Sequence, residues 1–95
     1  MLIVSKNAEE DISQAAIWYE HQRKGLGLDF ILAVEAALSS ISRDPFHFQE
    51  LRFGYRRGIV KRFPYAIIYR LDNERIVVMA VWHFSRKPWG WKARP

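Results

Sequence analysis

The side chain best suited to proton transfer follows the most apolar run of the sequence. Residues 75–86, RIVVMAVWHFSR, carry no charged side chain between Arg75 and His83, and Ser85 and Arg86 come directly afterwards. A histidine titrates near neutral pH and can act as a general acid or base. His83 is therefore our candidate for proton transfer. A histidine at the end of a strand can equally complete a local hydrogen-bond network, and both roles remain open.

Basic and aromatic residues alternate through the second half of the chain. Such a mixture can bind phosphates and stack on bases, or it can receive an acidic, amphipathic segment of a partner protein. We predict a partner- or nucleic-acid-binding surface that includes Arg56, Arg57, Lys61, Arg62, Arg86, Lys87, Trp89, Trp91 and Lys92.

The net charge of +5 hides a division between the two halves of the chain. Residues 1–51 hold four Lys or Arg against eight Asp or Glu, a net charge of −4, whereas residues 52–95 hold eleven against two, a net charge of +9. A half that is so basic implies an anionic partner. The alternative is a solvated basic face with no partner.

Composition excludes several classes of site. Cysteine is absent, so disulfides and thiolate metal sites are impossible. No His, Asp and Glu residues have the spacing of metal ligands, and we expect neither a metal nor a cofactor. His21 and His47 are expected at the surface. No apolar run approaches the roughly 20 residues of a membrane span, no secretory signal is visible, and we expect a cytoplasmic protein.

Periodicity predicts a short strand at residues 2–4 and then two helices. Asn7 is the expected N-cap of the first helix, with Glu10 three residues on, and the helices should cover residues 8–24 and 27–43. Asp44-Pro45 ends the second helix. The short break between the helices indicates an antiparallel helical hairpin whose common apolar face needs a sheet to cover it.

Three successive strands are predicted at residues 55–63, 65–71 and 76–84. The last should be buried on both faces, with Ile76, Val78, Ala80, Trp82 and Phe84 on one side. Tyr65, Tyr69 and Trp82 are expected in the core. The fold class is therefore α+β: one domain over residues 1–95, with the helical hairpin on one face of a mainly antiparallel sheet of about four strands. Residues 87–95 form a basic, Trp-rich tail.

This order of elements, together with several local strings, resembles the RelE/ParE superfamily of bacterial toxins from type II toxin–antitoxin systems. The strings are AEEDISQAAIWY at residues 8–19, the helix end at Asp44-Pro45, RFPYAIIY at 62–69 and VWHFSRKPWGW at 81–91. The last resembles the tail of the ParE-like, plasmid-stabilisation branch. The resemblance covers almost the whole chain.

The resemblance implies a growth-inhibiting toxin that forms a hetero-oligomer with a cognate antitoxin. ParE-like members are associated with poisoning DNA gyrase, and RelE-like members cut messenger RNA on the ribosome. If this chain is such a nuclease, Arg57, His83 and Arg86 are its candidate catalytic residues, with Lys61 nearby. Nucleases of the family carry an arginine where this chain has Ala66, so we favour gyrase poisoning without catalysis. A ribosome-dependent endoribonuclease is the alternative, and a plain basic RNA-binding module is a third.

Overall fold

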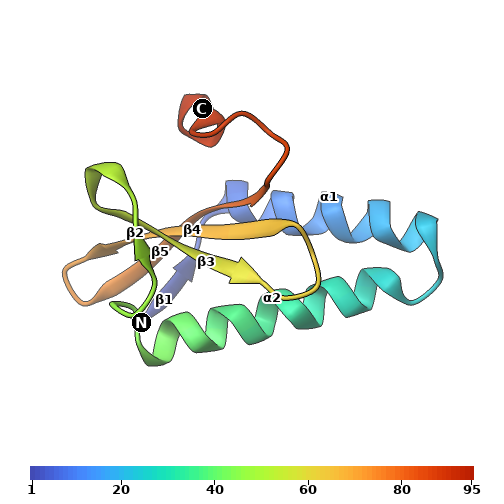
Figure 1. The fold of residues 1–95 in the computed structure, drawn as a ribbon, viewed down its shortest axis with the longest axis horizontal. Coiled ribbons are helices and arrows are strands. Elements are labelled where there is room, and N and C mark those ends of the chain that lie inside the picture. Colours follow the sequence, from blue (N-terminus) through green and yellow to red (C-terminus); the bar gives the residue numbers. More distant parts are fainter.

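The protein is a five-stranded sheet with two helices on one face (Figure 1). The computed structural model describes residues 1–95. Strand β1 is parallel to β5, the other neighbours are antiparallel, and the strand order is β1-β5-β4-β3-β2. The elements are β1 (Leu2–Val4), α1 (Lys6–Gln22), α2 (Leu26–Arg43), β2 (Gln49–Glu50), the 3-10 turn η1 (Arg52–Gly54), β3 (Tyr55–Val60), β4 (Tyr65–Asp72), β5 (Arg75–His83) and the 3-10 turn η2 (Gly90–Ala93). The α+β fold and the N-terminal strand are confirmed. The fifth strand is β2, a two-residue strand between α2 and η1 that the sequence did not predict.

Helix α1 begins two residues earlier than the sequence suggested. Ser5 is the N-cap, and its Oγ accepts a hydrogen bond from the Ala8 N–H at 3.1 Å. The prediction of Asn7 as the cap was wrong, because the Ser5 N–H donates to the Val78 carbonyl at 3.0 Å and so holds Ser5 extended at the end of β1. Asn7 lies inside the helix, and its amide donates to the carbonyl of Pro95.

The junction between the helices depends on one carboxylate and one glycine. Glu20 accepts hydrogen bonds at 3.0 Å from the N–H groups of Gly25 and Gly27, and these bonds lower the pKa of its carboxyl group. A Cβ atom on Gly27 would lie 2.6 Å from the Ala16 carbonyl oxygen. The helices therefore approach each other as closely as their backbones allow.

The sheet has an apolar cluster on each face. The larger cluster joins the helices to the sheet, and its most buried members include Phe30, Ile41, Ile67 and Tyr69. The smaller cluster, on the opposite face, contains Ala66, Ile68, Ala80, Trp82 and Trp91, and neither α1 nor α2 contributes to it. The C-terminal segment covers this second face instead, and Figure 1 shows it separated from α2 by the sheet.

Strand β5 is buried on both faces, as predicted, but its alternation is interrupted. Ile68 pairs with Ala80 whereas Tyr69 pairs with Val78, so Met79 is an extra residue in a β-bulge. Ile76 and Val78 face the helices, and Ala80 and Trp82 face the other way. The prediction that these four residues share a face, together with Phe84, was wrong, because a single inserted residue reverses the side-chain alternation beyond it, and β5 ends at His83, before Phe84.

Candidate functional site

A cleft of about 230 Å³ opens on the second face of the sheet, where β5 ends. Its lining combines three kinds of side chain: apolar residues of the sheet, basic residues at the sheet rim, and the aromatic tail. The lining residues are Leu51, Arg57, Ala66, Ile68, Trp82, His83, Phe84, Arg86, Pro88, Trp89 and Trp91. All three residues predicted as catalytic candidates, Arg57, His83 and Arg86, therefore border one cavity.

Arg86 presents a guanidinium group that no carboxylate neutralises. Its Cζ lies 3.7 Å from the centroid of the Trp82 ring, so the cation stacks on the indole face. Five ion pairs are present in the protein, and none includes Arg86 or Arg57. An unpaired cation fixed on an aromatic face at the rim of a cleft is well placed to bind an anionic group.

Arg57 reaches the cleft from β3 and is only partly satisfied. Its Nη2 donates to the side-chain oxygen of Gln49 at 2.7 Å, which fixes the guanidinium across the β2–β3 pair. Its Nε is buried and has no hydrogen-bond partner. Buried donors are normally paired, so this unpaired N–H is an exception within the β2–β3 pair.

His83 completes a tight turn and borders the cleft at the same time. Its Nδ1 accepts a hydrogen bond from the Ser85 N–H at 2.9 Å and lies 2.8 Å from the Ser85 Oγ. The ring also packs edge-on against Tyr65, with the centroids 4.9 Å apart. Because the backbone N–H donates to Nδ1, the proton of the neutral ring lies on Nε2. The hydrogen-bond network proposed for this histidine is present, and its role in proton transfer stays a prediction.

Two aromatic residues beside the cleft adopt an uncommon backbone conformation. Trp89 has φ 68° and Phe53 has φ 63°, in the left-handed region that bulky residues rarely occupy. Their rings meet edge to face with centroids 5.7 Å apart. Phe53 is 70% exposed. Such conformations cost free energy and cluster at binding sites. The sequence analysis did not select Phe53. The glycine that follows it, Gly54, was the only local indication of a tight turn at this position.

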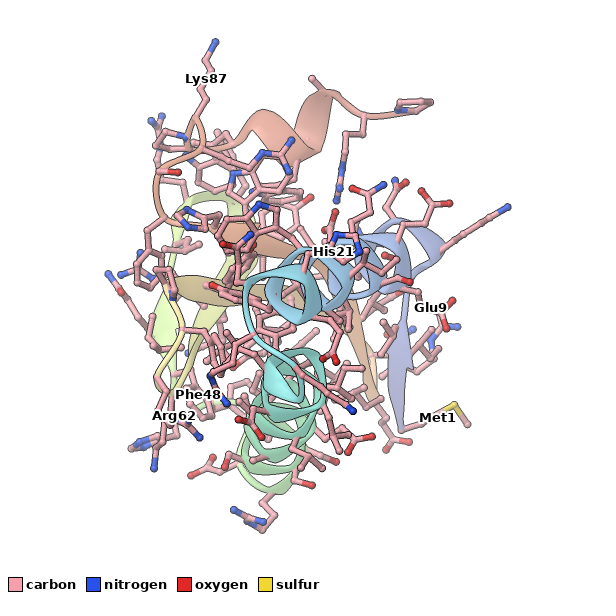
Figure 2. The ribbon with its side chains drawn as sticks, turned by 90° about the vertical axis from the view of Figure 1, so that its right-hand side faces the viewer. Met1, Glu9, His21, Phe48, Arg62 and Lys87 are labelled. Atoms are coloured by element: carbon pink, nitrogen blue, oxygen red, sulfur yellow. The ribbon has the colours of Figure 1, made fainter.

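The remaining basic residues of the predicted surface do not gather at this cleft. Arg56 donates to the carbonyls of Phe46 and Phe48 and lies 3.7 Å from Glu50, so it fixes the connector after α2. Arg62 lies 3.9 Å from Asp29 on the helical side, and Lys61 lines a separate groove beside α2. Figure 2 shows Lys87 and Arg62 projecting on opposite sides of the molecule.

The tail residues mainly form one side of the cleft, and few of their side chains are free to bind a partner. Trp91 is 6% exposed, so little of its ring is available to a partner. Lys92 lies over the rings of Phe53 and Tyr55, at 5.0 and 5.4 Å from the centroids, and Lys87 is exposed. The predicted surface is thus divided into three parts: residues that line the cleft, tail lysines outside it, and cations beside the helices.

The aromatic residues and the other histidines lie where the sequence placed them. Tyr69 and Trp82 are buried, Tyr65 packs against the larger cluster, and His21 and His47 are exposed. The nearby arginines Arg62 and Arg70 do not line the cleft. Neither therefore replaces the arginine that nucleases of the family carry at the position of Ala66. No group of three His, Asp or Glu side chains is arranged to hold a metal ion.

None of the helices is both long enough and apolar enough to cross a membrane.

Comparison with known proteins links the chain to one family. A family model described as the ParE toxin of the type II toxin–antitoxin system parDE matches residues 2–88. Among solved structures, a chain described as the chromosomal ParDE TA system from P. aeruginosa superposes with a TM-score of 0.77 at 13% sequence identity. The match covers 86% of this chain and 92% of that chain. No curated protein gives a significant match.

Proposed function

Because this chain belongs to the ParE toxin family of type II toxin–antitoxin systems, we propose that it is a cytoplasmic toxin that poisons DNA gyrase by binding it, and that a cognate antitoxin holds it inactive. The toxin itself breaks no bond in this proposal. Its contact surface is the second-face cleft, which offers cations and aromatic faces to an acidic surface of the target.

The observation that carries the proposal is the alanine in the cleft lining. Cleavage of RNA by in-line attack of a 2′-hydroxyl needs donors for the charge that develops on phosphate and a group that transfers a proton. Removing one such donor typically slows a reaction by about 10²- to 10³-fold. Ala66 contributes only a methyl group beside Arg57 and Arg86. A cleft built in this way supports binding more readily than efficient cleavage.

A ribosome-dependent endoribonuclease is the second candidate, and one observation favours it. Arg57, His83 and Arg86 come from two strands and a loop, and they border the same cavity. Two cations and an imidazole could bind a phosphodiester and move a proton even without a donor at Ala66. The weaker donor set would make such an enzyme slow.

The proposed antitoxin is an acidic, amphipathic segment that pairs with the basic half of the toxin. Residues 52–95 carry a net charge of +9, which favours a partner of opposite sign. Phe53 is exposed between the cations of Arg52 and Lys92, and exposed Phe84 borders the cleft, so both rings can receive the apolar side chains of such a segment.

The test compares gyrase and RNA as targets with matched arginine variants. Purified toxin is assayed in gyrase supercoiling and in primer extension on a translated message, together with Arg86→Ala and Arg75→Ala. Arg75 is the control, because it lies at the other end of β5 and pairs with Asp72 at 2.9 Å.

We expect gyrase-dependent DNA breaks from the wild type and from Arg75→Ala, at least about tenfold fewer from Arg86→Ala, and no codon-phased RNA cuts. Codon-phased cuts that vanish in Arg86→Ala would replace this proposal with the ribonuclease. Equal potency of all three proteins on gyrase would remove the cleft from the contact surface.

A further inference from the structure

Beyond the bulge, the outer edge of β5 has no neighbouring strand. Strand β1 pairs with β5 only as far as Val78, so the backbone groups of Met79 and Val81 need other partners. Asp11 on α1 accepts a hydrogen bond from the Val81 N–H at 2.9 Å. The Met79 carbonyl accepts one from Arg94 Nη2 at 3.1 Å. Side chains from the two ends of the chain thus replace the missing strand.

Asp11 and Arg94 also bind each other. Arg94 Nη1 lies 2.7 Å from Asp11 Oδ1, across 83 residues of sequence. The side chains are 8% exposed for Asp11 and 21% for Arg94, so solvent screens this pair less than the other four, each of which has at least one partner that is 38% exposed or more. Arg94 Nε donates to the Trp91 carbonyl at 3.2 Å. One guanidinium therefore joins α1, the bulge of β5 and the tail.

Side-chain contacts, rather than a strand or a long helix, hold the tail over the sheet. Its only regular element is η2, four residues of 3-10 helix, and a helix so short has almost no stability of its own. Trp91 is buried against Trp82, and the Trp82 Nε1 donates to the Lys87 carbonyl at 3.1 Å. The strained φ of Trp89 persists only while these contacts determine it.

We propose that Asp11 and Arg94 form a clasp that fixes residues 87–95 as one wall of the cleft, and that both act as positioning residues for Trp89 and Arg86. The role of that wall in target binding rests on the proposed function, whereas the clasp itself does not. When the clasp is broken, the tail detaches locally: Trp89 leaves the cleft, and the apolar residues beneath Trp91 become accessible.

The test measures hydrogen exchange of individual backbone amides in Asp11→Asn and Arg94→Gln. Gly90 and Lys92 report on the tail, because their N–H groups donate to the carbonyls of Lys87 and Trp89. Ile67 reports on the centre of the sheet. Arg75→Gln is the matched control, since it breaks the exposed pair with Asp72 by the same chemical change.

We expect Gly90 and Lys92 to exchange at least about tenfold faster in Asp11→Asn and in Arg94→Gln, while Ile67 changes by less than about twofold. The double variant should match the single ones, because each single change removes the same interaction. Arg94→Lys should fall between, since lysine keeps the charge and loses the fork of donors. Arg75→Gln should alter neither site.

Two results would overturn the clasp: tail amides that stay protected in both variants, or an equal acceleration at Ile67, which would mean that the pair only stabilises the whole fold. Potency on gyrase is then compared between the two variants. Asp11→Asn should be less potent than Arg75→Gln, because Trp89 leaves the cleft when the clasp is broken. A wild-type protein with no effect on gyrase would refute the proposed function and leave the clasp intact.

Discussion

At the scale of single residues, identical side chains in this protein have different roles because their neighbours differ. Arg56 and Arg57 are adjacent on β3 and project to opposite faces of the sheet. The Arg56 guanidinium donates to two backbone carbonyls, whereas the Nε of Arg57 has no partner. Arg86 stacks on Trp82 and meets no carboxylate. The cation of Arg86, which no carboxylate neutralises, supports our proposal that this cleft binds a ligand.

Tyr69 makes the stability of the protein sensitive to alkaline pH. Burial raises its pKa to about 12, and its hydroxyl donates to the Pro45 carbonyl at 2.7 Å. A pKa that is higher in the folded state than in the unfolded state contributes stability that is complete below about pH 10 and is lost as the pH rises toward 12. We expect the free energy of unfolding to fall by roughly 2 to 3 kcal/mol across this window.

Urea unfolding at several pH values between 8 and 12 measures the effect, and Tyr69→Phe is the control. The variant should lose about 1 kcal/mol at pH 8, because the hydrogen bond to Pro45 is gone. It should then show a shallower alkaline fall, since burial also raises the pKa of Tyr19 and Tyr65. Parallel curves for wild type and variant would show that Tyr69 does not set the alkaline limit.

At the scale of elements, two features place the cleft: the close helix pair and the bulge in β5. The helices cover only one face of the sheet, which leaves the other face to the tail. The bulge turns Ala80 and Trp82 toward that other face, where Trp82 supports both Arg86 and Trp91. Without the extra residue, the alternation would point Trp82 at the helices.

The close helix pair predicts the outcome of one conservative change, Gly27→Ala. Alanine favours a helix by about 1 kcal/mol over glycine, yet its Cβ would lie 2.6 Å from the Ala16 carbonyl. Overpacking of this kind costs about 1 to 3 kcal/mol, so we expect a net loss of stability. Thermal unfolding measures it, with Ser39→Ala at an exposed position of α2 as the control. A gain in stability for both variants would contradict the close approach.

At the scale of the whole molecule, opposite charges are divided between the two halves of the chain. The acidic half forms β1, both helices and β2, and the basic half forms most of the sheet and the tail. Long-range attraction therefore favours an acidic partner at the sheet rather than at the helices.

This division predicts how the cognate antitoxin responds to salt and to charge reversal. Arg57→Glu and Lys61→Glu should each weaken the complex, and raising the salt from about 0.15 to 1 M should weaken it too, because the Debye length falls from about 8 to 3 Å. Arg57 lies in the cleft and Lys61 beside α2, so an antitoxin that is sensitive to both reaches both faces of β3. Calorimetric titration at two salt concentrations measures both effects. An affinity unchanged by salt and by both substitutions would exclude this surface as the docking site.

The sequence alone determined both helices, four of the five strands, the order of these elements and the family. Apolar periodicity identified both helices and the three long strands, and the local strings indicated a ParE-like toxin, which the family match confirms. These features depend on residues close together in the chain, where the spacing of apolar side chains reports directly on helix or strand. The apolar run that ends at His83 also predicted that β5 is buried on both faces, and the structure confirms this.

Only the tertiary structure decided which side chains meet. The bulge at Met79 is not visible in the pattern, because one extra residue reverses the faces without changing composition. The pairing of Asp11 with Arg94 joins positions 83 residues apart, and local spacing contains no information on such a contact. The division of the basic residues between two faces followed from the course of β3 and its turn, which placed Arg57 in the cleft and paired Arg62 with Asp29.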